Sequence, residues 1–249
     1  MLFLIVLGYL LMLSLQQAIA QHHHEEVVYN KNSWYALTTD YSFNHRWGAH
    51  AEIQARRNGL IYKPQQFVFR LGANYHYTPS VTFTLGASHI HKSPYGAKPA
   101  ALPKSEHNLY EQVNLKQHVR RFSFQHRYRI EQRWVDKVVA VDNEPQIQGK
   151  KYLNRMRYRL SVKIPLNTYK IQSGTWFLVG GNEVFINTSA LTSGNTFNQN
   201  WLFGSLGYQM SHWARIKVGY LHQFIKKSSA QAISNHTFTL GLFCHFNQH

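Results

Sequence analysis

The sequence has few carboxylates, a single cysteine and little charge overall. It contains 11 Asp and Glu against 27 Lys and Arg, a formal net charge of +16, yet charged residues make up only 15% of the chain. Soluble domains usually carry roughly 25% charged residues. The only cysteine is Cys244, which excludes an intramolecular disulfide framework. No Walker-type loop, coiled coil or internal repeat is visible, and the mildly polar composition excludes a bundle of membrane helices.

The basic residues are scattered along the chain instead of being gathered in a tail or on one helix. A nucleic-acid-binding protein usually concentrates its positive charge on one element or face. We therefore expect no nucleic-acid partner, and the charge surplus requires another explanation.

The N-terminal segment indicates export from the cytoplasm. Residues 1–15 are apolar throughout, and the run is too short for a membrane-spanning helix. Ala18, Ile19 and Ala20 then form the A-x-A pattern of a signal-peptidase site. No lysine or arginine precedes the apolar run, which departs from the usual pattern. We predict a signal peptide at residues 1–20, cleaved after Ala20, and a mature domain at residues 21–249.

Beyond the signal, apolar and polar residues alternate with a period of two. In residues 67–77, for example, Phe67, Phe69 and Leu71 alternate with Arg70 and Gly72. This period is that of a β-strand with two different faces, and about 9–11 residues suffice for a tilted strand to cross a bilayer. Aromatic residues reach 14% of the chain. The pattern indicates strands that present rings to lipid and polar groups to a wet interior.

Short and long connections alternate between these segments. We count eleven clear segments, and bacterial barrels usually have an even strand number, so one more upward strand is expected within residues 25–31. We predict an all-β, antiparallel up-and-down transmembrane β-barrel of about twelve strands, with ten as the alternative. Short turns should face the periplasm. Short connections are expected near residues 44–45, 78–79, 120, 167–169 and 212, and long ones at 58–64, 93–106, 135–150, 188–198 and 226–234.

A ladder of charge stands out in "FQHRYRIEQRW", residues 124–134. One parity of this segment is charged and the other carries Tyr128, Ile130 and Trp134, with His126 and Gln132 as polar exceptions. An arginine on the lipid face would cost roughly 2–4 kcal/mol at mid-membrane, so the charged parity is expected to face the lumen. The next segment supplies a second basic row, and glutamates elsewhere are the expected counter-charges. The predicted lumen-facing set is Arg127, Arg129, Glu131, Arg133, Arg155, Arg157, Arg159, Glu52 and Glu183.

Several segments, in order along the chain, resemble a family of uncharacterised outer-membrane β-barrels of Gram-negative bacteria that carries a domain-of-unknown-function label. The resemblance implies a barrel fold and supplies no reaction. Trp201 stands where the family pattern favours arginine. The matching stretches begin with Trp34 and continue through "EIQARR" (52–57), "EHNLYEQVNL" (106–115), "HRYRIEQRW" (126–134), "RMRYRL" (155–160), "NEVFIN" (182–187), "FNQNWLFGSLGYQ" (197–209) and "GYLHQ" (219–223).

The expected location is the bacterial outer membrane. The expected partners are outer-membrane lipid, lipopolysaccharide, the barrel assembly machinery and anionic small solutes. Two roles for the charge ladder remain open. The ladder can brace the wall through Arg–Glu networks, or it can bind and pass anions, because rings of Arg and Lys select anions. No cofactor and no metal site is predicted.

An enzymatic role is the alternative. Some outer-membrane barrels hydrolyse lipids, and "SHIHKS", residues 88–93, supplies Ser88, His89 and His91 near the expected outer end of a strand. A serine hydrolase needs its base oriented by a third group, and no acid accompanies these residues. Moreover, neighbouring residues of a strand point to opposite faces, so Ser88 and His89 should diverge.

Overall fold

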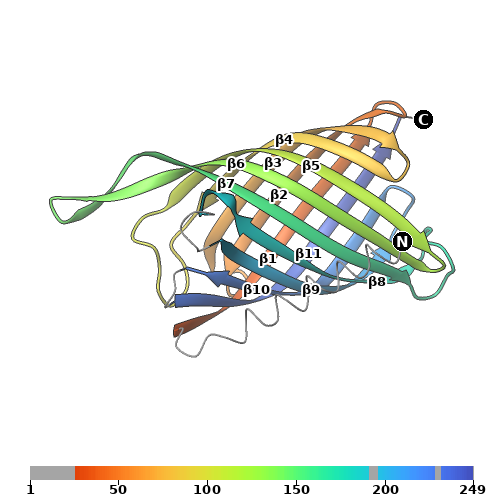
Figure 1. Ribbon diagram of the computed structural model, residues 1–249. Coiled ribbons are helices and arrows are strands. Elements are labelled where there is room, and N and C mark those ends of the chain that lie inside the picture. Colours follow the sequence, from red (N-terminus) through yellow and green to blue (C-terminus); the bar gives the residue numbers. More distant parts are fainter. Residues whose placement is uncertain (1–25, 191–195, 228–230, 249) are drawn as a thin grey trace.

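The computed structural model describes residues 26–190, 196–227 and 231–248, so the signal peptide predicted for residues 1–20 lies outside the described part. Within that part, eleven strands form one closed barrel (Figure 1). No helix of the described residues is long and apolar enough to cross a membrane. The elements are β1 (Glu26–Ser42), β2 (Trp47–Asn58), β3 (Lys63–Thr78), β4 (Val81–Lys92), β5 (Lys104–Val119), β6 (Phe122–Val141), β7 (Glu144–Pro165), β8 (Trp176–Asn187), η1 (Thr188–Ala190), β9 (Phe197–Gln209), β10 (Ala214–Lys226) and β11 (Gln231–Asn247).

The barrel closes between β1 and β11, which pair in parallel from Glu26↔Gln231 to Ser42↔Asn247. All other neighbouring strands pair antiparallel. The prediction of twelve or ten strands is therefore wrong. The segment expected to hold an extra strand, from Glu26 onward, is the start of β1 itself. A parallel seam joins two strands that run in the same direction, so an odd number of strands closes without an unpaired edge.

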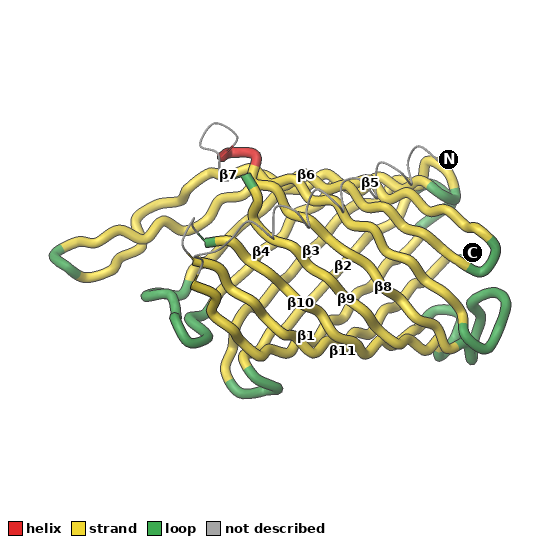
Figure 2. The backbone as a smooth tube through the Cα atoms, turned by 60° about the horizontal axis from the view of Figure 1, so that its bottom comes forward, coloured by secondary structure: helices red, strands yellow, loops and turns green. Residues whose placement is uncertain are grey.

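The connections gather at two ends of the barrel, which we call the turn end and the loop end (Figure 2). Turns of residues 43–46, 79–80, 120–121 and 210–213 lie at the turn end, as predicted, but the β7–β8 connection spans residues 166–175 and is longer than predicted. At the loop end, β6 and β7 continue far beyond the barrel as a two-stranded hairpin, where a long loop was predicted. Asp142 and Asn143 form its tip with φ of 53° and 66°, a conformation that Asp and Asn tolerate.

The two faces of the barrel differ in polarity. Large apolar side chains such as Leu85, Leu71 and Ile130 are exposed on the outer face. Arg129, Glu131 and many other polar side chains are instead buried on the inner face. Side chains alternate across a strand, so the period of two in the sequence becomes an apolar outside and a charged inside.

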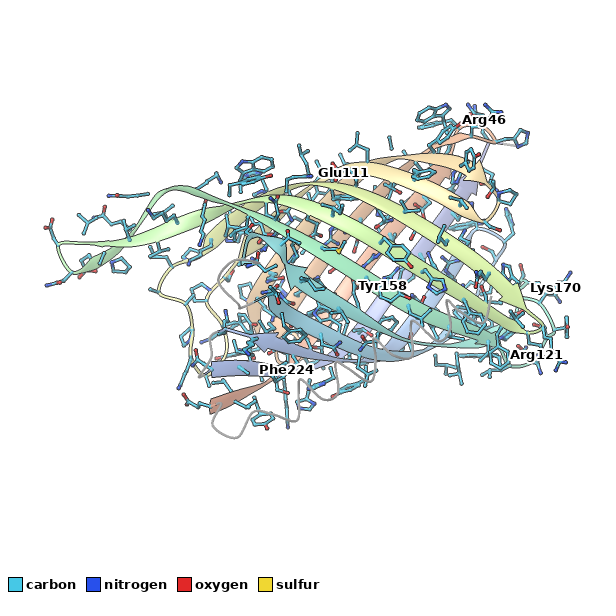
Figure 3. All side chains as sticks on the ribbon, in the orientation of Figure 1. Arg46, Glu111, Arg121, Tyr158, Lys170 and Phe224 are labelled. Atoms are coloured by element: carbon cyan, nitrogen blue, oxygen red, sulfur yellow. The ribbon has the colours of Figure 1, made fainter. Side chains whose placement is uncertain are left out.

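The two polar exceptions on the apolar parity of β6 have partners on the outer face. His126 Nδ1 lies 2.9 Å from the hydroxyl of Tyr158. Gln132 Nε2 lies 3.2 and 3.3 Å from the carboxylate oxygens of Glu111. Figure 3 labels Tyr158 and Glu111 on the outer side of these strands, and it shows Arg46, Arg121 and Lys170 at the turn end. Local pairing thus gives each of the two polar side chains a partner, although the buried Oε1 of Gln132 accepts no hydrogen bond within the described residues.

Candidate functional site in the barrel lumen

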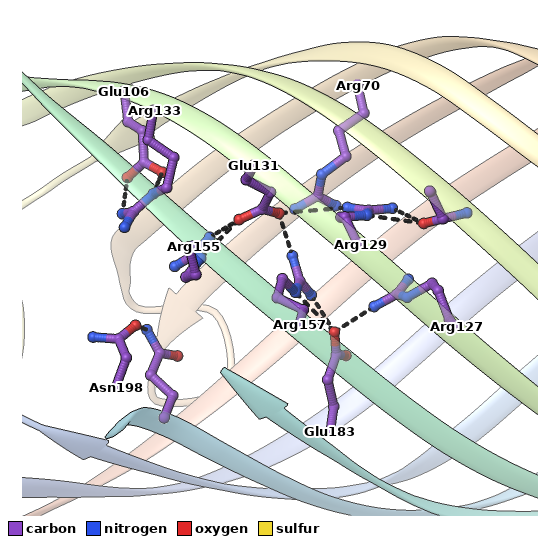
Figure 4. A network of polar contacts seen from close by, with 12 residues as sticks. Arg70, Glu106, Arg127, Arg129, Glu131, Arg133, Arg155, Arg157, Glu183 and Asn198 are labelled. Carbon is purple, nitrogen blue, oxygen red and sulfur yellow. Dashed lines mark hydrogen bonds and ion pairs between the residues drawn. The ribbon is translucent and has the colours of Figure 1, made fainter. Parts of the chain in front are cut away.

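The charge ladder occupies the inner face of β6 and β7. The register pairs Arg127 with Arg159, Arg129 with Arg157 and Glu131 with Arg155. Figure 4 shows Arg127, Arg129, Glu131, Arg155 and Arg157 converging inside the barrel. Like charges directly opposite each other destabilise a sheet unless counter-charges lie between them. The counter-charges come from Glu131 on β6 itself and from Glu183 on β8.

Glu131 is the centre of the network and only 2% of its side chain is exposed. Arg155 donates from Nε to Oε2 at 2.7 Å, and Arg157 donates from Nη1 to Oε1 at 2.7 Å. Arg129 Nη1 lies 3.7 Å from Oε1. A buried carboxylate is stable only when it is paired and hydrogen-bonded, and Glu131 meets both conditions.

Glu183 on β8 extends the network to the strand that neighbours β7. Arg127 Nη2 donates to its Oε1 at 2.6 Å, and Arg157 Nε donates to the same oxygen at 2.8 Å. Arg157 therefore bridges Glu131 and Glu183. The remaining predicted glutamate, Glu52, pairs with Arg70 at 2.8 Å instead of with the ladder.

A second ion-pair cluster lies near the loop end and was missed in the sequence. Glu106 accepts bonds from Arg133 Nε at 2.7 Å and from Arg133 Nη2 at 3.0 Å, and it also pairs with Lys92. Its position on an inward parity of β5 is the signal that identifies it. Arg70 could be identified in the same way, from its position on the inward parity of β3. How deep Glu106 and Arg70 lie along the barrel axis could not be predicted from the sequence, because this depth depends on the register between strands.

Aromatic side chains also reach the lumen. The guanidinium of Arg56 lies 3.8 Å from the ring centroid of Trp34 and 5.6 Å from that of Trp201. The two tryptophan rings meet edge to face at 5.1 Å. Within the described ranges, Arg56 donates its hydrogen bonds to Gln54 and Gln66 and to no carboxylate. Trp201, at the position where the family pattern favours arginine, thus faces a cation.

Two cavities occupy the lumen. The larger one, about 190 Å³, is lined toward the turn end by Phe203, Lys217 and Phe243. The smaller one, about 70 Å³, is lined toward the loop end by Lys92 and Glu106. Five residues line both cavities and lie between them, and we call this layer the partition: Trp34, Arg56, Arg70, Arg157 and Trp201.

The larger cavity is bordered by cations that have no carboxylate partner among the residues that the structure describes. The buried Nε of Arg159 makes no hydrogen bond within the described residues. The register places Arg159 beside Glu183, whose Oε1 is already shared by Arg127 and Arg157. Lys217 Nζ lies over the ring of Phe243 at 3.8 Å. Together with Arg56, these groups give the cavity an excess of positive charge.

The serine and histidines of the alternative enzymatic role do not converge. Ser88 is buried on the inner face, opposite Arg70 and Asn108. His89 is instead on the outer face, where its Nδ1 lies 3.4 Å from that of His107. His91 shares the parity of His89. The candidate nucleophile Ser88 and the candidate bases His89 and His91 therefore lie on opposite faces of the barrel wall.

One serine and one histidine do meet on the outer face. His222 Nε2 lies 2.8 Å from Ser234 Oγ, although Ser234 is only 4% exposed. Within the described residues, no carboxylate or amide contacts the other ring nitrogen of His222. A nucleophile–base pair without an orienting third group lacks the geometry of a serine hydrolase.

We expect alanine at His89 and His91 to leave barrel assembly intact, because both rings lie on the outer face away from the charge network. We also expect purified wild-type protein to deacylate neither phospholipid nor lipopolysaccharide. Release of fatty acid can be followed by mass spectrometry, with heat-modifiable gel migration as the assembly control. Deacylation by the wild type that is lost in either single variant would contradict this expectation.

A closed all-β barrel with a charged lumen and an apolar outside is the class of protein that the fold and the site define. The chain belongs to the family described as protein of unknown function (DUF2490), whose model matches residues 31–234, from β1 to β11. The predicted membership of a domain-of-unknown-function family is thereby confirmed.

Among solved structures, the chain is similar to a NanC porin in a rhombohedral crystal form, with 12% identity, a TM-score of 0.45, and coverage of 80% of this chain and 89% of that chain. A comparison with curated proteins gives no match. Within the described residues, no group of three or more His, Cys, Asp or Glu side chains is placed to hold a metal ion.

Proposed function

We propose that this protein is a bacterial outer-membrane β-barrel whose basic lumen binds or passes small anionic solutes. The exposed apolar side chains on the outer face support membrane insertion, because the bilayer is the solvent that such a surface requires. In this proposal the signal peptide at residues 1–20 is removed after Ala20. The turn end faces the periplasm and the loop end faces outward.

The observation that carries the proposal is the unequal pairing of charge in the lumen. Four lumen glutamates are shared by seven cations. The glutamates are Glu52, Glu106, Glu131 and Glu183, and the cations are Arg70, Lys92, Arg127, Arg129, Arg133, Arg155 and Arg157. Arg56, Arg159 and Lys217 have no carboxylate within ion-pair distance in the described part. A pore lined by Arg and Lys lowers the energy of an anion inside it and raises that of a cation.

A second candidate function is purely structural, and one observation favours it. The five large side chains of the partition border both cavities inside the lumen. In this second function the ion-pair network stabilises the barrel wall and passes no solute. In either case the proposed partners are outer-membrane lipid, lipopolysaccharide and the barrel assembly machinery. Anionic solutes are partners only in the first.

Fractionation tests the proposed location. We expect the protein in the outer-membrane fraction, in a form whose gel migration changes when it is heated before electrophoresis. An N-terminal sequence beginning at Gln21 is expected for the mature chain. Recovery from the soluble periplasm with unchanged migration would contradict the membrane assignment.

Reversal potentials in planar bilayers test the basic lumen. Under a salt gradient, we expect any conductance of the purified barrel to favour anions, because unpaired cations line the larger cavity. The triple variant Arg56→Gln, Arg159→Gln, Lys217→Gln should lose this preference. Cation preference in the wild type would rule out an anion pathway, and absence of conductance would favour the structural function.

A further inference from the structure

The larger cavity exists because long and short side chains face each other across the lumen. Arg127, Arg157 and Arg159 reach inward from β6 and β7. On the opposite side of the barrel, β1 and β11 contribute Ala36 and Gly241, which are paired in the register. Small residues there leave room in front of the guanidinium groups, whereas a larger side chain at Ala36 would extend into that space.

The polar part of this cavity has unused hydrogen-bonding capacity for an anion. Arg159 has a buried Nε without a hydrogen-bond partner. A guanidinium carries five N–H donors in a planar fork that matches a carboxylate. Lys217 lines the same cavity, and its Nζ lies over the ring of Phe243 without a carboxylate within ion-pair distance among the described residues. An anion between Arg159 and Lys217 would receive charge-assisted hydrogen bonds that these groups lack in the protein alone.

Part of the remaining lining is aromatic, beside the carboxylates of Glu52 and Glu183 and several smaller residues. Trp34, Trp201, Phe203 and Phe243 border the cavity. An inorganic anion would leave these rings without contact, whereas the flat body of an organic ring can stack on them. The lining therefore suits a molecule with one charged end and one apolar ring.

The volume limits the size of this molecule. The cavity measures about 190 Å³. An apolar protein cavity of roughly 150 Å³ accommodates benzene. The space is therefore sufficient for one ring with a single carboxylate.

We propose that this cavity binds a small organic anion that carries a single ring. The carboxylate lies against Arg159 and Lys217, and the ring faces Trp201 and Phe203. The inference rests on the proposed function, since it names the class of anion that the basic lumen takes.

Isothermal titration of the purified, detergent-solubilised full-length protein tests the inference. Benzoate is the probe, acetate supplies the charge without the ring, and benzyl alcohol supplies the ring without the charge. We expect benzoate to bind more tightly than either. Arg159→Gln should weaken benzoate binding by about tenfold or more, because it removes a charged donor.

Two further variants make the test independent of the charge network. Ala36→Leu fills the cavity without altering any ion pair, and we expect it to abolish benzoate binding while heat-modifiable migration is preserved. Arg120→Gln is the matched control, since it removes the same charge from the turn of residues 120–121. This control should leave binding unchanged.

The outcomes separate this inference from the proposed function. Equal affinity for benzoate, acetate and benzyl alcohol would overturn the inference, and so would benzoate binding that persists in Ala36→Leu. The anion preference in potassium chloride is measured separately and can hold in that case. Conversely, benzoate binding by a barrel that is absent from the outer membrane would support the cavity and contradict the proposed function.

Discussion

Replacing Glu131 by glutamine is expected to lower the free energy of unfolding by about 3–5 kcal/mol, the cost of removing one partner from a buried ion pair. Glu131 accepts hydrogen bonds from both Arg155 and Arg157 and is almost completely buried. Glutamine keeps the shape of the side chain but removes its charge. Arg155 would then lose its only carboxylate partner within the described residues and remain buried.

Urea titration of the refolded barrel, followed by tryptophan fluorescence or by heat-modifiable migration, measures this change. Glu144→Gln is the matched control, because Glu144 is exposed at the start of β7 near the hairpin tip. We expect the control to change the stability by less than about 0.5 kcal/mol, as for most surface substitutions. An effect of Glu131→Gln as small as that of the control would show that the network is not a source of stability.

Opening the partition is expected to raise the conductance of the barrel by about tenfold or more, because the narrowest constriction limits the passage of ions. The variant Arg56→Ala, Trp201→Ala removes two of the side chains that lie between the two cavities. It also removes the cation–π contact between Arg56 and Trp201. The ion pairs of Glu131 and Glu183 remain in place, so the wall should still assemble.

Single-channel recording in planar bilayers compares this variant with the wild type. The control is Arg46→Ala, Trp47→Ala, which removes the same two residue types where the chain leaves the turn end and enters β2. Trp47 is 52% exposed and does not line either cavity. Equal conductance in the two double variants would show that the partition does not limit passage.

The strand pattern was predictable because it is local. Successive side chains of a strand point to opposite faces, so the parity of Arg127, Arg129 and Glu131 followed from the spacing alone. The same rule separated Ser88 from His89. It failed for the β6–β7 connection, where residues 135–150 were predicted as a loop and are largely strand. The strands of a hairpin that projects beyond the barrel can pair without alternating apolar and polar residues, because they do not separate an apolar outer face from a polar lumen.

The partners within the lumen were not predictable. Glu52 was expected to compensate the ladder, and it pairs with Arg70 on the neighbouring strand instead. Trp34 and Trp201 lie far apart in the sequence, and only the closed barrel brings both rings against Arg56. Contacts of this kind depend on the stagger between strands, which alternation does not determine.

By itself, the sequence determined the all-β class, the inner and outer faces of each strand and the family. The tertiary structure decided that β1 and β11 close the barrel in parallel, that Arg157 bridges Glu131 and Glu183, and that small residues opposite Arg159 leave a cavity. The physical reason is one of range. The period of two arises from the geometry of each strand alone, whereas closure, depth and cross-lumen contacts arise from the pairing of strands that are distant in the chain.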